Sequence, residues 1–219
     1  MLIETLAVFM IYIVLITILY GLLPLIFIHL NSNLNGIRAI YPLVCVIFIA
    51  SLYEFIGSFL LEINVELWFL IYDLLVFLSV HYFFYTLLNK KYAKLFITVI
   101  LLLILSYGFL SFDERLLNYL QISAFFFVFQ TLRIFLFSII WFKNIFQECE
   151  IENLLESPHF YIISGLLIYY CGSVVLFLSA SHIYETNHSD FQYYWLLNII
   201  LTFVLRTSLI VGIWKARRE

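Results

Sequence analysis

Long apolar runs separated by short polar breaks dominate this chain of 219 residues. Several runs approach or exceed the roughly 20 residues that a helix needs to cross a bilayer. Helices are the expected spanning form because they satisfy every backbone polar group within their own segment. Only 11% of the residues are charged, whereas a soluble domain has about 25%. The sequence therefore predicts an all-α, polytopic transmembrane bundle embedded in a lipid bilayer.

The polar breaks divide the chain into seven expected spans within one domain of residues 1–219. The first run lacks a basic start and is too long for the apolar core of a typical signal peptide, so we expect it to be retained. The expected spans cover approximately residues 5–29, 39–61, 67–88, 95–110, 116–142, 160–180 and 191–214.

Basic residues predict the orientation, because cytoplasmic loops carry an excess of lysine and arginine. If the N-terminus is outside and the C-terminus cytoplasmic, the outer segments hold only Arg115. The cytoplasmic segments then hold Arg38, Lys90, Lys91, Lys94, Lys143, Lys215, Arg217 and Arg218. The sequence thus predicts this orientation.

Ionisable residues deep inside apolar spans are the main clue to function, because a charge is costly there. Glu54 and Asp73 lie at similar depth towards the outer ends of two consecutive antiparallel spans. If their faces converge, the two carboxylates share a proton, bind a cation or hold an amine. The alternative is that each carboxylate separately hydrogen-bonds a neighbour and fixes helix packing.

Arg133 and Arg206 form a second set at matched depth in the inner half of the membrane. They precede Lys143 and Lys215 by ten and nine residues, which is roughly 13–15 Å along a helix. We expect no intramembrane carboxylate at this depth. The pair therefore predicts a water-filled cavity or an anionic ligand, such as a phosphate, a carboxylate or a lipid, that suits the guanidinium fork. The alternative is pairing with helix carbonyls or with Asp73.

Other polar residues extend these two sets. Asn198 and Thr202 precede Arg206 at intervals of four, Gln130 precedes Arg133 by three, and His81 follows Asp73 by eight. For His81 the alternative is an ordinary packing role. One axial cavity is predicted to be lined by Glu54, Asp73, His81, Gln130, Arg133, Asn198, Thr202 and Arg206.

Two further features concern partners. Gly165, Gly172 and Ser179 recur every seven residues, which favours close helix packing and leaves a homo-oligomer open. The expected cytoplasmic loop 143–158 is acidic and is either a solvated loop or a docking site for a basic signalling protein. We expect no metal or cofactor, because the cysteines form no CxxC. We expect no nucleic acid partner, because there is no basic stripe.

The segment Ser157–Gly172 and the end of the chain, from Tyr194–Asn198 to Trp214-Lys215, resemble small bacterial seven-helix membrane proteins. The resemblance implies a stand-alone sensory or accessory module in the bacterial cytoplasmic membrane, working with a separate kinase. It implies no catalytic residue. A retinal pigment is rejected, because the seventh span offers Arg206 where retinal proteins carry a lysine.

These observations favour a sensory or signalling module that binds a small or lipid-like ligand and couples to a cytoplasmic partner. One alternative is a small proton- or cation-coupled transporter or channel that uses Glu54 and Asp73. A second is a lipid-modifying enzyme that uses His81 and the carboxylates. The chain has no HExxH, no glycine-rich phosphate loop and no GxSxG, so we expect a protein that is not an enzyme.

Overall fold

The computed structural model describes residues 2–30, 37–54, 56, 66–88, 90–111, 119–148, 154–186 and 188–217. This part of the chain is helical and contains no strand. Short 3₁₀ helices η1 (Arg38–Ile40), η3 (Lys90–Tyr92) and η4 (Leu154–Glu156) accompany the longer elements. The seven α-helices are α1 (Leu2–His29), α2 (Tyr41–Tyr53), α3 (Glu66–Leu87), α4 (Ala93–Ser111), α5 (Tyr119–Glu148), α6 (Pro158–Thr186) and α7 (His188–Ala216).

Three helical stretches of the described chain are long and apolar enough to cross a membrane. They are Ala124–Gln147, Pro158–Ala180 and Tyr194–Ala216. The remaining helices contribute shorter apolar stretches of 10–17 residues, such as Leu15–His29 and Ile71–Leu87. The all-helical character that the sequence predicts is therefore confirmed for the described residues, and the three long apolar helices support a membrane protein.

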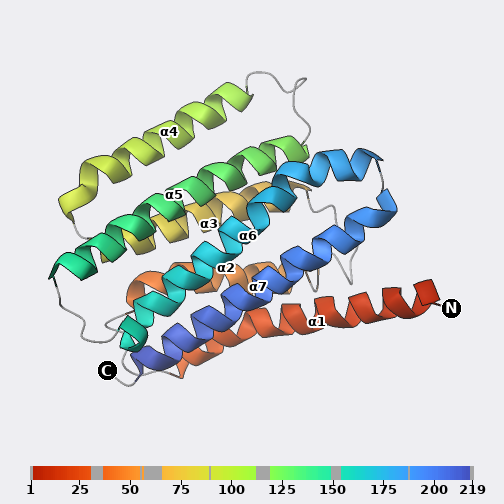
Figure 1. The fold of residues 1–219 in the computed structure, drawn as a ribbon, viewed down its shortest axis with the longest axis horizontal. Helices are drawn as coiled ribbons and strands as arrows, with labels where there is room; N and C mark the ends of the chain where they lie inside the picture. The colour runs from red at the N-terminus through yellow and green to blue at the C-terminus, as the bar shows by residue number, and fades with distance from the viewer. Residues whose placement is uncertain are drawn as a thin grey trace.

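Six of the helices close into a ring. Following the helix contacts, α1 packs on α2, α2 on α3, α3 on α5, α5 on α6, α6 on α7, and α7 back on α1. Helix α4 packs on α3 and lies at one edge of the molecule, and the two termini lie at opposite ends of the bundle (Figure 1). The ring gives these six helices a common interior, and each can bury a polar side chain there.

Several helix boundaries differ from the expected ones. Helix α5 continues to Glu148, so the first third of the expected loop 143–158 is helical. Helix α6 runs to Thr186, beyond the expected end at residue 180. Helix α6 begins at Pro158. Proline lacks a backbone N–H, but an N–H in the first turn has no partner within the helix, so no helical hydrogen bond is lost there. Residues 57–61 of the expected second span lie outside the described residues.

Glycines allow α6 and α7 to pack closely. A side chain on Gly165 would clash with Ser208, and a Cβ on Gly172 would lie 2.9 Å from the Leu201 side chain. The glycine face of α6 is thus occupied by α7 of the same chain. A homo-oligomer stays a prediction, but the part of this face around Gly165 and Gly172 is already used.

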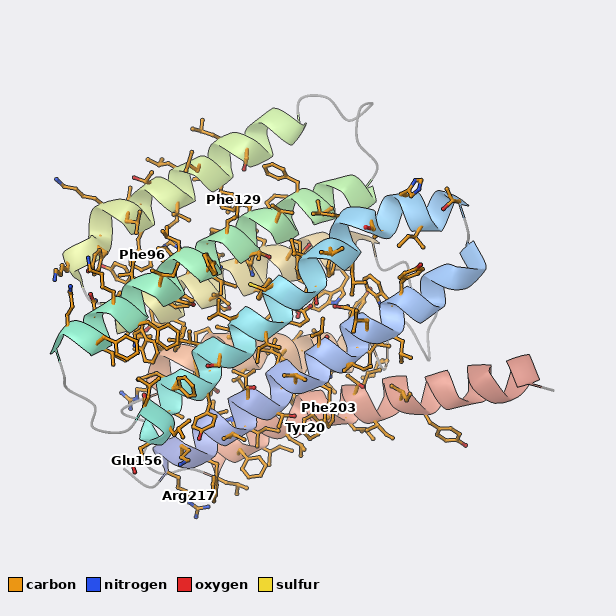
Figure 2. All side chains as sticks on the ribbon, viewed as in Figure 1. Tyr20, Phe96, Phe129, Glu156, Phe203 and Arg217 are labelled. Carbon is orange, nitrogen blue, oxygen red and sulfur yellow. The ribbon has the colours of Figure 1, made fainter. Side chains whose placement is uncertain are left out.

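Helix α7 also packs on α1, and aromatic side chains form this contact. The rings of Tyr20 and Phe203 stack with centroids 4.4 Å apart. Figure 2 labels the two residues, which lie beside each other between α1 and α7. The Tyr20 hydroxyl also lies 3.2 Å from the Thr207 hydroxyl, within hydrogen-bonding distance. These contacts hold α1 and α7 together where the ring closes.

The α6–α7 contact can be tested with Gly165→Val. We expect the variant to be less stable by about 1–3 kcal/mol, because the added side chain must displace Ser208 in a packed interface. The measurement is the midpoint of thermal unfolding in detergent. Ile168→Val, at a half-exposed position of the same helix, is the matched control. An unchanged midpoint for Gly165→Val would show that the helices do not pack as described.

Candidate functional site

Arg133 of α5 lies inside the ring with 3% of its surface exposed. Its Nη1 donates a hydrogen bond of 2.9 Å to the carbonyl of Phe77 on α3, and its Nη2 donates one of 3.2 Å to Oε1 of Gln130. The guanidinium carbon also lies 3.9 Å from the centroid of the Phe77 ring, a cation–π contact. A carbonyl, an amide and a ring, all neutral groups, therefore hold this charge.

Gln130 connects Arg133 to α6. While its Oε1 accepts from Arg133, its Nε2 donates a hydrogen bond of 2.7 Å to the hydroxyl of Tyr170. Thr131 bonds the same region of α6 through the carbonyl of Tyr170, at 3.4 Å. Gln130 uses both ends of its amide, so Arg133 and Tyr170 belong to one hydrogen-bonded network.

Arg206 of α7 occupies a second buried position, where α1, α2 and α7 meet. It is 5% exposed and donates a hydrogen bond to the carbonyl of Thr17 on α1. One turn further along α1, a Cβ on Gly21 would lie 2.8 Å from the Arg206 guanidinium and would clash with the Ser51 hydroxyl of α2. Only glycine at position 21 leaves room for both side chains.

Glu54, the residue that follows the end of α2, lies near enough to Arg206 for the two opposite charges to influence each other. Helices α2 and α7 both pack on α1 and enter the bundle from opposite ends (Figure 1). The expectation that no carboxylate lies at the depth of Arg206 stays a prediction, but a carboxylate does act on this arginine.

Three tyrosines lie among the charged residues of the ring: Tyr170, which is buried, and Tyr72 and Tyr169, which are partly buried. Tyr72 of α3 lies in the electric field of both Glu54 and Arg206. Tyr169 of α6 interacts with the hydroxyl of Thr202 on α7 and with the charge of Asp73, and the charges of Glu54 and Arg206 also act on it. Both predicted carboxylates therefore act on one phenol.

Tyr170 extends the network towards α5. It hydrogen-bonds Gln130 and feels the charges of Arg133 and Asp73. Tyr169 and Tyr170 are neighbours in sequence and interact with each other. The pair thereby connects the Arg206 side of the ring to the Arg133 side.

The remaining predicted residues lie around this centre. Asn198 of α7 accepts a hydrogen bond of 3.2 Å from Ser173 of α6, and its carbonyl accepts one of 2.8 Å from Thr202. His81 of α3 stacks on Phe77 and meets Phe96 of α4 edge-on, with ring centroids 5.0 Å apart. The charge of Arg133 also acts on His81. These contacts give His81 an aromatic environment at the boundary between the ring and α4.

Four buried polar atoms of this region have no hydrogen-bond partner within the described part of the chain. They are Nε of Arg133, Nε of Arg206, Nδ1 of His81 and the hydroxyl of Ser51. Buried polar groups are nearly always hydrogen-bonded. The Nε–H groups of the two arginines and the Ser51 hydroxyl are thus spare donors, which is the chemistry that an anionic oxygen requires. Nδ1 of His81 is a donor or an acceptor according to its tautomer.

No tyrosine is among the residues that the sequence predicts for the cavity, although Tyr72 directly precedes Asp73. Tyr169 and Tyr170 are missed altogether, because they are two of 16 tyrosines in the chain. The available signal was the adjacent pair Tyr169-Tyr170 in the middle of an apolar span, far from either interface at which tyrosine is ordinarily enriched.

Comparisons of the chain with protein-family models, with curated proteins and with solved structures gave no match in any of the three.

The network can be tested with Gln130→Leu. Leucine can neither accept from Arg133 nor donate to Tyr170. We expect the free energy of unfolding to fall by about 1–3 kcal/mol, because a buried charge and a buried hydroxyl each lose a partner. Equilibrium unfolding in mixed micelles measures the change.

The matched control is Leu132→Ile, two residues along α5 at a position that is 64% exposed. We expect its free energy of unfolding to lie within about 0.5 kcal/mol of the wild-type value. Equal stability of Gln130→Leu and the control would contradict the bridging role of Gln130.

Proposed function

We propose that the protein is a seven-span membrane sensory module that binds a small anionic or lipid-like ligand at the buried network. The spare donors on Arg133, Arg206 and Ser51 are the observation that carries this proposal. A buried donor without a partner is costly, and an anionic ligand would supply acceptors to several of them at once. The contacts of Arg133 described above are with neutral groups, so this guanidinium is well placed to take the negative charge of a ligand.

The proposed orientation has the N-terminus outside and the C-terminus in the cytoplasm, in a bacterial cytoplasmic membrane. The excess of basic residues at one end supports it. The positions of the two termini at opposite ends of the bundle agree with an odd number of spans (Figure 1). A fluorescent protein fused after Glu219 should fluoresce, because it stays in the cytoplasm, whereas a periplasm-dependent phosphatase fused there should be inactive. The reverse pattern would invert the orientation.

The signal would leave the membrane through the end of α5 and the following η4. Helix α5 continues to Glu148, with Phe146 68% exposed near its end, and Leu155 on η4 is 56% exposed. Glu156 and Arg217 lie at this same end of the molecule (Figure 2). Exposed apolar side chains beside acidic ones would suit a cytoplasmic signalling protein with a basic, partly apolar face.

Native mass spectrometry of gently purified protein tests the ligand proposal. We expect the wild type to retain an anionic lipid or metabolite that Arg133→Gln/Arg206→Gln loses. Arg217→Gln, an exposed arginine near the C-terminus, is the matched control and should retain the adduct. If neither the wild type nor the double variant carries an adduct, the two arginines do not bind a retained ligand and their role is structural.

A small proton- or cation-coupled transporter is the second candidate. It is favoured by the convergence of Glu54 and Asp73 on Tyr169, since paired carboxylates and phenols can pass or hold a proton. Proteoliposomes should then show a proton or cation flux that disappears in Glu54→Gln. If the wild type shows no flux of protons or common ions, this candidate is eliminated and the sensory proposal stands.

A further inference from the structure

A groove of about 550 Å³ lies outside the ring, between the start of α2 and the later half of α3. Its volume falls within the roughly 300–1,000 Å³ of ordinary ligand sites. The lining residues come from η1 and α2 on one wall and from α3 on the other. They are Arg38, Tyr41, Pro42, Leu78, Ser79 and Tyr82.

The groove opens away from the polar interior. On α3, Phe77 and Val80 are 2% and 0% exposed and face the core. Leu78 and Tyr82 are 48% and 50% exposed, and their spacing of four residues places them on one outer face. In a chain that crosses the membrane, this outer face meets lipid.

The two ends of the groove differ in chemistry. One end carries Arg38, which is exposed, beside Tyr41. The exposed imidazole of His29 meets the Tyr41 ring edge-on with centroids 6.0 Å apart. The remainder of the groove is lined by Pro42, Leu78 and the ring of Tyr82. A cationic end continuous with an apolar trough matches a molecule with an anionic head and an apolar tail.

Charge also favours a lipid of this kind. Among the described residues that line the groove there is no acidic side chain to compete for Arg38. Arg38 lies at the end of the bundle that holds the excess of basic residues, which the orientation above assigns to the cytoplasmic leaflet. That leaflet is the one rich in anionic lipids, and each basic residue near it adds about 1 kcal/mol of attraction.

We propose that this groove binds one anionic phospholipid. Arg38 holds the headgroup phosphate, with Tyr41 and His29 beside it, and an acyl chain lies along Leu78 and Tyr82. A free phosphate would contact only the cationic end and would leave the apolar part of the groove, along Leu78 and Tyr82, without a ligand. The site is separate from the buried network; its assignment to the anionic leaflet rests on the proposed orientation, whereas the groove itself does not depend on the sensory proposal.

Native mass spectrometry with defined lipids tests the groove. The full-length protein in neutral detergent is titrated with phosphatidylglycerol and, separately, with phosphatidylcholine. We expect one phosphatidylglycerol to bind more tightly than phosphatidylcholine, and Arg38→Gln to weaken it by roughly five- to tenfold, because one charged contact is lost. Lys94→Gln, an exposed cation at the start of α4 outside the groove, should leave the affinity unchanged.

Leu78→Trp is a second variant, in which the trough is filled while Arg38 keeps its charge. Because Leu78 is half-exposed, the larger side chain should be tolerated, and thermal unfolding confirms that the variant is folded. We expect it to lose the phosphatidylglycerol adduct. Equal binding of the two lipids, or wild-type affinity in both Arg38→Gln and Leu78→Trp, would overturn the proposal.

Discussion

The burial of two guanidiniums inside an apolar helical bundle is the constraint on which the rest of this structure depends. An arginine at the centre of a membrane helix costs about 2.5–3.5 kcal/mol even on permissive scales. The structure meets this cost differently at its two sites. Arg206 has a backbone carbonyl and the opposing charge of Glu54, whereas Arg133 has a carbonyl, an amide and an aromatic face.

This difference explains how the ring of six helices is joined. Arg206 lies between α1 and α2, and Gly21 leaves the space that its guanidinium occupies. Arg133 hydrogen-bonds α3, and Gln130 connects it to Tyr170 on α6. Helix α4, which packs on the outer side of α3, meets His81 at that boundary through Phe96. Polar side chains thus join neighbouring helices around the ring, within a core of buried apolar residues.

The sequence predicted the helical membrane fold and most of the polar residues, because both follow from local properties. Long apolar runs identify helices, and an ionisable residue within such a run is conspicuous. It did not predict the neighbours of each residue, which depend on how helices close into a ring. Glu54 was matched with Asp73 by depth, but its charge also acts on Arg206 across the bundle. Tyr169 and Tyr170 were missed because the large number of tyrosines hides the few that join the network.

A double-mutant cycle between Glu54→Gln and Arg206→Gln tests most directly whether opposing charges stabilise the bundle interior. The quantity is the free energy of unfolding of the wild type, both single variants and the double variant in mixed micelles. Each single variant should be destabilised, because it leaves one buried charge uncompensated. The double variant should be more stable than the sum of the two changes predicts, with a coupling energy of about 1 kcal/mol or more. If the change in unfolding free energy of the double variant equals the sum of the two single changes to within about 0.3–0.5 kcal/mol, the two residues do not stabilise each other. That result would contradict the account.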